Sequence, residues 1–425
     1  MCEKIKIMKR SLFAMFLALA NLVKSHAAAG APNVVSPEVH ADRTVTFRIA
    51  APKATEVTLV GDWVDGAQKL TKADDGVWSL TLGPLAPSTY IYTFNVDGVS
   101  TTDPINPRTK IRTRGGGSLL VVLADSPSVQ EAQDVPHGAV EVNWQKSSVL
   151  GETRRVLVYT PPGYSQNSSH RYPVLFLLHG SGDNADSWAT VGNLNFIADN
   201  LIAEKKMTPM VIVMPNFYSA TFVSSPGRGA GGGRRVGGGD DAVAGGGSNT
   251  NNADGNSGGG RGGGGESGNA KYYKYLVEEI LPMVESKYHV ATGRENRAVA
   301  GMSLGANQSL DLFFGHFDLF SSVGALCPSR YGAIENTYAS LLTDAKNMNA
   351  KTSVLWVGCG RQDPQHFPGS QRVDEVLTAH QINHVWHPTE GVHNYAIWRD
   401  YLVEFLPLLF QQHASIAASP AARKK

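Results

Sequence analysis

The sequence predicts an α/β fold with a mainly parallel central sheet, preceded by a small all-β sandwich. The first third of the chain contains short runs in which apolar and polar residues alternate, separated by turn residues, as in antiparallel strands. The remainder contains apolar runs without alternation, separated by helical segments, as expected for strands buried on both faces of a parallel sheet. A chain of 425 residues is long enough for two or three domains.

The charge balance gives no indication of a polyanionic partner. Lys and Arg together number 38 and Asp and Glu 37, which leaves a formal net charge of +1. Binding to a polyanion such as nucleic acid is therefore not indicated.

The N-terminus has the pattern of a secretory signal, which we place at residues 1–28. A basic run at 4–10 precedes an apolar core at 12–23 and small residues at 25–29, where we expect cleavage. The apolar core is short for a membrane span, although retention as an anchor is the alternative. We expect a secreted or periplasmic protein with no membrane attachment after cleavage.

Alternating runs at 45–49, 57–60, 78–82 and 90–96 predict the sandwich, within residues 33–124. The segments R-I-A-A-P-K-A, V-T-L-V-G-D-W, D-G-V-W, Y-I-Y-T-F-N-V-D-G and D-P-I-N-P resemble the early-set, immunoglobulin-like sandwich of family-48 carbohydrate-binding modules. That module often precedes secreted polysaccharide esterases. Trp63, Trp78 and Tyr92 are able to stack on a sugar ring, but a domain of this size needs aromatic residues in its core, so we favour packing.

After a linker at 125–139, residues 140–412 carry the α/β pattern. Antiparallel strands are expected at 140–144 and 154–160, and a helix is expected at 193–204 and another at 272–288. Buried parallel strands are expected at the following runs: 174–178, 210–214, 298–300, 322–326, 353–357 and 384–387. Residues 413–425 are expected to be a flexible tail.

A glycine-rich insert at 224–270 interrupts this region. It contains almost nothing apolar to bury, so we expect it to be mobile. Its glycine runs lack the G-K-[ST] of a phosphate-binding loop, and no cofactor is indicated.

One stretch predicts nucleophilic catalysis. An apolar strand at 298–300 runs into Gly301-Met302-Ser303-Leu304-Gly305, and a helix at 306–314 follows. This strand, tight turn and helix present a serine above the end of a sheet and require glycine where backbones approach closely. The turn also aims the N–H of Leu304 at the oxygen on which negative charge develops during acyl transfer. We predict Ser303 as the nucleophile.

A serine nucleophile needs a base and an acid that orients it, and both follow the serine in this order of elements. We predict Asp363 as the acid and His393 as the base, because each lies in a loop after an expected strand. Other carboxylates and imidazoles compete for these roles: Asp374, Glu390, His366, His384 and His387. A metal site formed by Cys359, Asp363 and His366 has no recognised ligand spacing.

The second oxyanion donor is expected in His179-Gly180-Ser181-Gly182, after the strand at 174–178. Gly180 and Ser181 are the candidates. Cys327 and Cys359 each end an apolar run and are expected to be buried thiols, although a disulfide between them is compatible with an oxidising compartment.

A second resemblance covers roughly residues 140–410 apart from the insert. The segments Y-T-P-P-G-Y, Y-P-V-L-F-L-L-H-G-S-G-D-N-A-D-S-W, V-I-V-M-P-N, N-R-A-V-A-G-M-S-L-G, W-V-G-C-G-R-Q-D and G-V-H-N-Y-A-I-W resemble carbohydrate esterase family 1, the secreted feruloyl and acetylxylan esterases. This resemblance implies an α/β-hydrolase fold and places the triad on Ser303, Asp363 and His393. Two departures are Ala306, where the family often has glycine, and the insert near the mouth of the site.

The sequence thus predicts a secreted serine esterase that removes feruloyl or acetyl groups from xylan or a small ester. Siderophore ester cleavage, acyl transfer to a sugar, and sugar binding by an inactive hydrolase domain are the alternatives.

Overall fold

The computed structural model describes residues 34–63, 66–112, 116–164, 170–217, 268–329 and 332–411. The predicted secretory signal, almost all of the glycine-rich insert and the C-terminal tail lie outside these residues. Within these ranges, no helix combines the length and the apolar character that crossing a bilayer requires.

The N-terminal part consists of two antiparallel sheets. One has the order β1 (Glu38–Val39), β2 (Val45–Ala50), β6 (Val77–Leu82), β5 (Thr71–Lys72). The other has the order β4 (Gln68–Lys69), β3 (Val57–Gly61), β7 (Ser88–Val96), β10 (Gly116–Val122), β9 (Thr109–Ile111), with β8 (Val99–Thr101) beside β7. Both sheets contribute to one hydrophobic cluster, since Phe47 of β2 packs with Leu59, Phe94 and Leu120 of the second sheet. The four predicted strands are confirmed as β2, β3, β6 and β7.

The three aromatic residues considered for sugar binding pack in this part of the chain. Trp78 and Tyr92 are buried, and the Trp78 ring nitrogen donates to the Ala51 carbonyl at 3.0 Å. The Trp63 ring stacks on Phe47, with centroids 5.3 Å apart. The packing interpretation is confirmed, because these rings are engaged in contacts with other side chains.

The larger sheet has eight strands in the order β11 (Ala139–Lys146), β12 (Thr153–Thr160), β14 (Val211–Pro215), β13 (Val174–Leu178), β15 (Arg297–Met302), β16 (Ser322–Leu326), β17 (Val354–Gly360), β18 (Val385–Thr389). The first two strands join antiparallel, and all pairs from β14 to β18 are parallel. Every residue of β13, β14, β16 and β17 is buried. The predicted parallel sheet, with strands buried on both faces, is confirmed.

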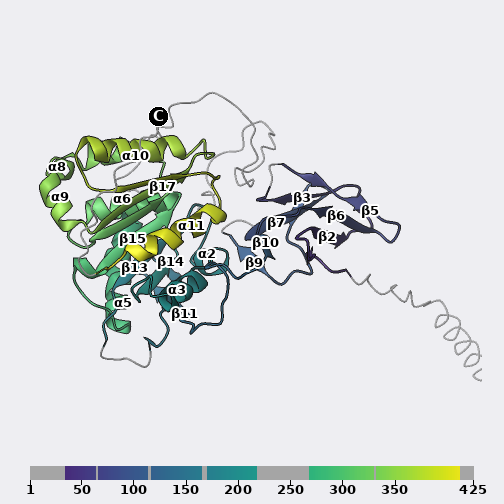
Figure 1. Cartoon of the computed structure of the whole chain (residues 1–425), viewed down its shortest axis with the longest axis horizontal. Coiled ribbons are helices and arrows are strands. Elements are labelled where there is room, and N and C mark those ends of the chain that lie inside the picture. Colours follow the sequence, from purple (N-terminus) through teal and green to yellow (C-terminus); the bar gives the residue numbers. More distant parts are fainter. Residues whose placement is uncertain are drawn as a thin grey trace, which may run out of the picture.

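Helices cover both faces of this sheet (Figure 1). One face packs against α6 (Leu304–Gly315), α10 (Phe367–Ala379) and a long helical stretch made of α4 (Gly268–Tyr275), a π-helical turn (Leu276–Ile280) and α5 (Leu281–Lys287). The short helices α7 (Gly332–Thr337), α8 (Ala339–Leu342) and α9 (Ala345–Lys351) join the same hydrophobic cluster. The other face packs against α2 (Ser187–Thr190), α3 (Leu194–Ala203) and α11 (Tyr395–Phe405).

The N-terminal sheets pack directly on the larger sheet's layer of helices, and Figure 1 shows β9 and β10 as their nearest strands. Ile91 of β7 and Leu119 of β10 are buried in the same cluster as α3 and α11. The segment expected to be a linker is also held, because Asn200 of α3 donates to the carbonyls of Val129 and Glu131 at 2.9 and 2.8 Å. The two parts of the chain therefore share a continuous interior.

Candidate active site

Ser303 occupies the predicted tight turn between β15 and α6. Its backbone has φ 54° and ψ −117°, a conformation that costs energy for any residue other than glycine. A Cβ added at Gly301 would lie 2.6 Å from the backbone of Gly305, and one added at Gly305 would lie 2.6 Å from the carbonyl oxygen of His179. Both glycines are therefore required by close backbone approach, as the sequence predicted. The Ser303 N–H donates to the Leu326 carbonyl of β16 at 2.8 Å and anchors the turn to the sheet.

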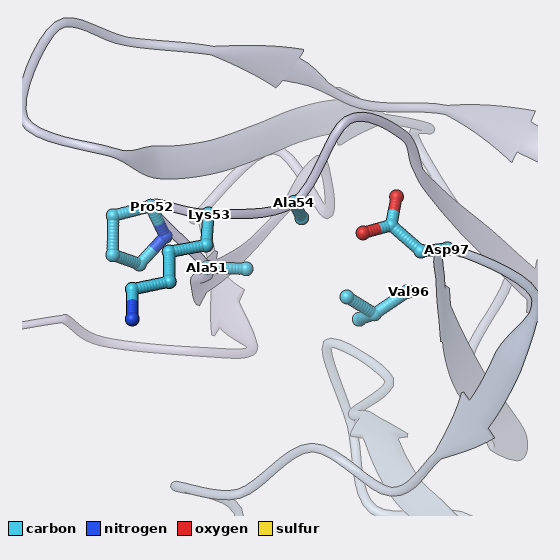
Figure 2. Close-up of a pocket in the computed structure, with 6 residues that line it drawn as sticks. All are labelled: Ala51, Pro52, Lys53, Ala54, Val96 and Asp97. Atoms are coloured by element: carbon cyan, nitrogen blue, oxygen red, sulfur yellow. The ribbon is translucent and has the colours of Figure 1, made fainter.

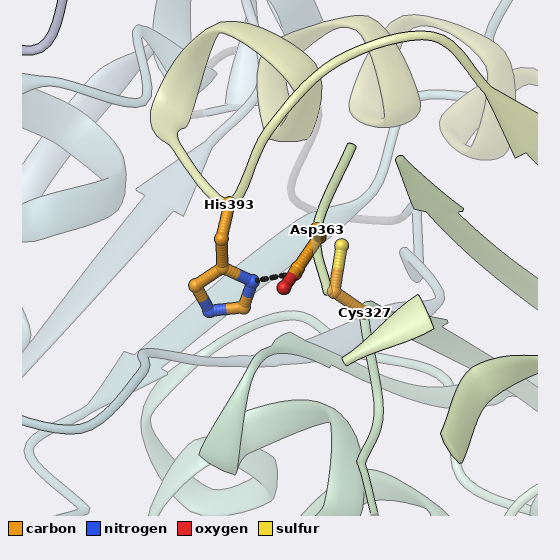
Figure 3. A group of neighbouring side chains, drawn as sticks. All are labelled: Cys327, Asp363 and His393. Atoms are coloured by element: carbon orange, nitrogen blue, oxygen red, sulfur yellow. Dashed lines mark hydrogen bonds and ion pairs between the residues drawn. The ribbon is translucent and has the colours of Figure 1, made fainter. Parts of the chain in front are cut away.

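Asp363 and His393 meet beyond the carboxyl ends of β17 and β18. His393 Nδ1 lies 2.6 Å from Asp363 Oδ2 (Figure 3). The carboxylate is buried, with its side chain 3% exposed, and the imidazole rests edge-on against the Trp398 ring at 4.9 Å. Since Nδ1 is held by the carboxylate, Nε2 is the ring nitrogen left for proton transfer.

The electrostatics of this pair favour a carboxylate beside a neutral imidazole. Burial alone would raise the pKa of Asp363, but hydrogen bonds from His366 and His393 outweigh burial and hold the pKa below its ordinary value. Burial lowers the pKa of His393, and the neighbouring His366 lowers it further, against the opposing effect of Asp363. At neutral pH His393 is therefore able to accept a proton, as a general base must.

A second histidine shares the same carboxylate. His366 Nδ1 lies 3.0 Å from Asp363 Oδ1, and the His366 ring stacks on the His393 ring with centroids 3.7 Å apart and planes 10° from parallel. From the sequence, His366 was a competing base and one member of a considered metal site, and its place beside His393 was not predicted. The three-residue spacing from Asp363 was the available signal, because a loop that turns into α10 brings positions i and i+3 together.

The other competing residues pair elsewhere. His384 Nε2 lies 2.9 Å from Asp374 of α10, and His387 Nε2 lies 2.9 Å from Glu404 of α11. Glu390 lies 3.8 Å from Arg361. Of the candidate carboxylates, Asp363 is therefore the one that the structure brings together with His393, and His366 shares it.

Ser303 follows β15 and the Asp363–His393 pair follows β17 and β18, so β16 lies between them in the sheet. Cys327 directly follows Leu326, the residue bonded to Ser303 N–H, and donates its own N–H to Gly358 of β17 at 2.7 Å. Its thiol lies within 4.8 Å of ligand atoms of both Asp363 and His393 (Figure 3). Among the residues described here, Ser303 Oγ makes no hydrogen bond to His393, and catalytic hydrogen bonds are often long until substrate binds.

The loop after β13 lies against the serine turn. A Cβ at Gly180 would be 3.4 Å from the Ser303 Cβ, so Gly180 lies next to the predicted nucleophile. Buried His179 fixes this loop, since its Nδ1 bonds to the Gly180 carbonyl at 2.8 Å and its Nε2 accepts from Phe217 N–H at 3.0 Å. Leu304 begins α6, and the first N–H groups of a helix have no partner within the helix.

The two cysteines of the described chain are buried free thiols, as the sequence predicted. Cys359 Sγ lies 4.0 Å from Asp363 Oδ2. Within the described ranges, the side chains whose ligand atoms lie within 4.8 Å of one another are Cys327, Asp363 and His393, not the set considered from sequence. Burial raises the pKa of the Cys327 thiol well above its ordinary value, so without a metal ion this thiol is protonated at neutral pH.

A hollow on the N-terminal sheets lies away from these residues (Figure 2). It is lined by Ala51, Pro52, Lys53, Ala54, Val96 and Asp97. The Asp97 carboxylate already accepts hydrogen bonds from the backbone N–H groups of Thr55 and Glu56. The hollow therefore presents mainly apolar side chains and a carboxylate that is already bonded.

The arrangement is that of an α/β-hydrolase fold, with a strained serine turn after β15 and an Asp–His pair after β17 and β18. The family model described as "Putative esterase" matches residues 147–229 and 243–409. The chain therefore belongs to this esterase family.

One curated relative shows a low sequence identity to this chain. A curated protein from Xylanibacter ruminicola named endo-1,4-beta-xylanase/feruloyl esterase is 26% identical over 387 residues, which are 89% of this chain and 46% of the relative. The chain thus spans about half the length of that relative.

Solved structures share the fold. The enterobactin esterase of Shigella flexneri, determined in the presence of enterobactin, has a TM-score of 0.56 and 17% identity, and the match covers 86% of this chain and 92% of that one. A CE1 ferulic acid esterase from Anaeromyces mucronatus, in complex with ferulic acid, has a TM-score of 0.50 and 23% identity, with coverage of 66% and 94%. The Shigella match is too long to be confined to the larger sheet and its helices, so it extends into the N-terminal sheets.

Proposed function

We propose that this esterase is a serine hydrolase in which Ser303, His393 and Asp363 form the triad. Ser303 Oγ attacks the ester carbonyl while His393 Nε2 takes its proton and then passes it to the departing alcohol. Water, activated by the same imidazole, hydrolyses the acyl-enzyme. The observation that carries the proposal is the 2.6 Å pair of His393 and Asp363 at the sheet edge where the strained Ser303 turn lies.

The oxyanion is stabilised by backbone donors on two sides of the nucleophile. Leu304 N–H at the start of α6 supplies one donor, and the loop at Gly180 and Ser181 supplies the other. The contact between Gly180 and Ser303 supports this assignment, because donors to the oxyanion must lie within about 3 Å of the developing charge.

We propose an acyl group on plant polysaccharide, feruloyl or acetyl on xylan, as the substrate. The relative named xylanase/feruloyl esterase supports this class. Residues 33–124 would form an early-set, immunoglobulin-like module, and the two facing antiparallel sheets support that assignment. Residues 1–28 would direct the enzyme to the periplasm or outside the cell.

A periplasmic siderophore esterase is the second candidate. It is favoured by one observation, the fold match to the Shigella enterobactin esterase, which extends over both parts of the chain. Hydrolysis rates on methyl ferulate, acetylated xylan and a catecholate siderophore distinguish the two, because each substrate releases a different product.

The triad is tested by Ser303→Ala with a p-nitrophenyl acyl ester as substrate. We expect a loss in kcat on the order of 10⁶-fold, as for other triad nucleophiles. Ser340→Ala, at an exposed serine of α8, is the matched control and should retain wild-type turnover. Substantial activity in Ser303→Ala would exclude this serine as the nucleophile.

A further inference from the structure

A buried lysine of the N-terminal sheets contacts the loop after β13, residues 179–183, which we call the oxyanion loop. Lys110 lies on β9 with its side chain 1% exposed, and its Nζ is 2.5 Å from Asp183 Oδ1. Lysine is almost never buried to this degree unless it is paired. Asp183 directly follows the Gly180–Gly182 stretch, and its side chain is 7% exposed. The N-terminal part of the chain thus places a cation against the loop that faces Ser303.

The same carboxylate reaches the helix that follows His393. Asp183 Oδ2 accepts a hydrogen bond from the Tyr395 hydroxyl at 2.6 Å, and Tyr395 is the first residue of α11, two residues after His393. Lys110 Nζ also lies 4.3 Å from the centre of the Tyr395 ring. One buried cluster, Lys110–Asp183–Tyr395, therefore joins β9, the oxyanion loop and the segment that carries the general base.

Neighbouring contacts hold the same junction. Asn184 Nδ2 donates to the Ile111 carbonyl of β9 at 3.1 Å. Arg112 Nε is 3.9 Å from Asp183 Oδ1, farther than Lys110 and on a side chain that is 31% exposed. Without Lys110, the partners left to the buried carboxylate among the described residues would be this more distant cation and the Tyr395 hydroxyl. A buried charge that loses its close partner is strongly unfavourable, so the loop would shift to find water or another partner.

We infer that Lys110 is a positioning residue for ester hydrolysis, acting through Asp183 to fix the oxyanion loop and the His393 segment together. The inference rests on the proposed triad and goes beyond it. It makes the N-terminal sheets a structural part of the active site, in addition to any binding role. A displacement of about 1 Å at a catalytic group costs on the order of 10²-fold in rate, so loss of this anchor should be visible in kcat.

The test is a double-mutant cycle in the full-length protein, with Lys110→Met, Asp183→Asn and both together. Steady-state hydrolysis of a p-nitrophenyl acyl ester gives kcat and KM, at a temperature where circular dichroism shows each variant folded. We expect each single variant to lose roughly 10- to 100-fold in kcat with little change in KM. Because both residues act through one contact, the double variant should be no slower than the slower single variant.

A parallel readout is the rate at which a fluorophosphonate labels Ser303, since this reagent forms a tetrahedral adduct that needs the oxyanion hole. We expect labelling to slow by the same factor as kcat. A role confined to stability would lower the melting temperature and leave kcat and labelling unchanged below it.

Lys72→Met is the matched control. Lys72 also belongs to the N-terminal sheets and its ammonium also bonds to protein oxygens, the carbonyls of Pro52 and Ala54 at 2.7 and 3.0 Å. Its removal should leave kcat, KM and labelling at wild-type values.

If the charge variants do not fold, Tyr395→Phe tests the same inference, because it keeps the ion pair and removes only the bond to α11. A lower kcat in Tyr395→Phe supports the inference. Wild-type kcat in Lys110→Met or in Tyr395→Phe, or independent losses that multiply in the double variant, would overturn it. Failure of the triad proposal is seen separately, as activity that survives in Ser303→Ala.

Discussion

Replacing His366 should move the acid limb of the enzyme's pH profile to higher pH. His366 stacks on His393 with ring centroids 3.7 Å apart and shares Asp363 with it. The charge of His366 lowers the pKa of His393, after burial, which is the larger cause. His366→Asn removes that charge while an amide remains within reach of the carboxylate. The pKa of His393 should therefore rise.

The size of the shift follows from the ring separation. Two unit charges about 4 Å apart repel by about 1 kcal/mol in water and by about 4 kcal/mol at an effective dielectric constant of 20. The His366 and His393 side chains are 17% and 20% exposed, so both rings still reach solvent and we adopt the lower part of this range. Removing this charge therefore relieves a repulsion of about 1 kcal/mol, so the midpoint of the acid limb should rise.

The measurement is kcat/KM from pH 4.5 to 9 for wild type and His366→Asn with a p-nitrophenyl acyl ester. Catalysis needs neutral His393, so activity falls as the pH drops through the pKa of this residue in the free enzyme. The variant should lose activity at a higher pH than wild type and match it more closely at pH 8. His384→Asn is the control, because it removes a histidine from another His–Asp pair, with Asp374. An acid limb that stays in place or moves to lower pH in His366→Asn would refute the reasoning.

Two further variants test the site and its turn. Asp363→Asn should lower kcat on the order of 10⁴-fold, because an amide no longer fixes the imidazole in the required tautomer, and a loss below tenfold in steady-state kinetics would remove this residue from the triad. Gly305→Ala should destabilise the fold by roughly 3 kcal/mol or more in urea unfolding, because its Cβ would lie 2.6 and 2.8 Å from the carbonyl oxygens of His179 and Leu178. Gly315→Ala at the other end of α6, where the nearest atom would be 3.5 Å away, should change stability little, and equal effects of the two substitutions would contradict the role of backbone contact.

The parts of the fold that were predictable are those determined by the pattern of apolar, polar and glycine residues within a short stretch of sequence. Strands β13 and β16 coincide with their predicted bounds, because five consecutive apolar or small residues are buried on both faces. The serine turn was also predictable, since the strand, the two glycines and the helix lie within a short stretch of chain. Strand β17 runs three residues beyond its predicted end, through Gly358 to Gly360, because glycine in sequence indicates a loop while here close neighbours leave no room for a Cβ.

Contacts that depend on the tertiary fold were out of reach. A lysine such as Lys110 is expected at the surface, and nothing near it in sequence indicates a partner 73 positions away in Asp183. The packing of Val129 and Glu131 against α3 was missed for a related reason, because a segment rich in polar residues between two patterns is typical of a linker. In both cases the contact depends on two segments that are far apart in the sequence and fit each other in the folded chain, and a single sequence does not show which segments meet.

The interface between the two parts of the chain bears on how substrate preference should be studied. Arg399 of α11 is almost fully buried and bonds to Ser88 Oγ of β7 at 2.5 Å and to the Val191 carbonyl at 2.8 Å. The helix that follows His393 is thus fixed on one side by the N-terminal sheets and on the other by the larger sheet. Removing the N-terminal sheets would expose the apolar side chains that pack on Ile91. It would also leave the buried Arg399 guanidinium without two acceptors, Ser88 Oγ and the Thr89 carbonyl. A truncated hydrolase region would consequently report the effects of a disturbed helix α11 together with those of a lost binding surface, so the two are separable only by point substitutions in the intact chain.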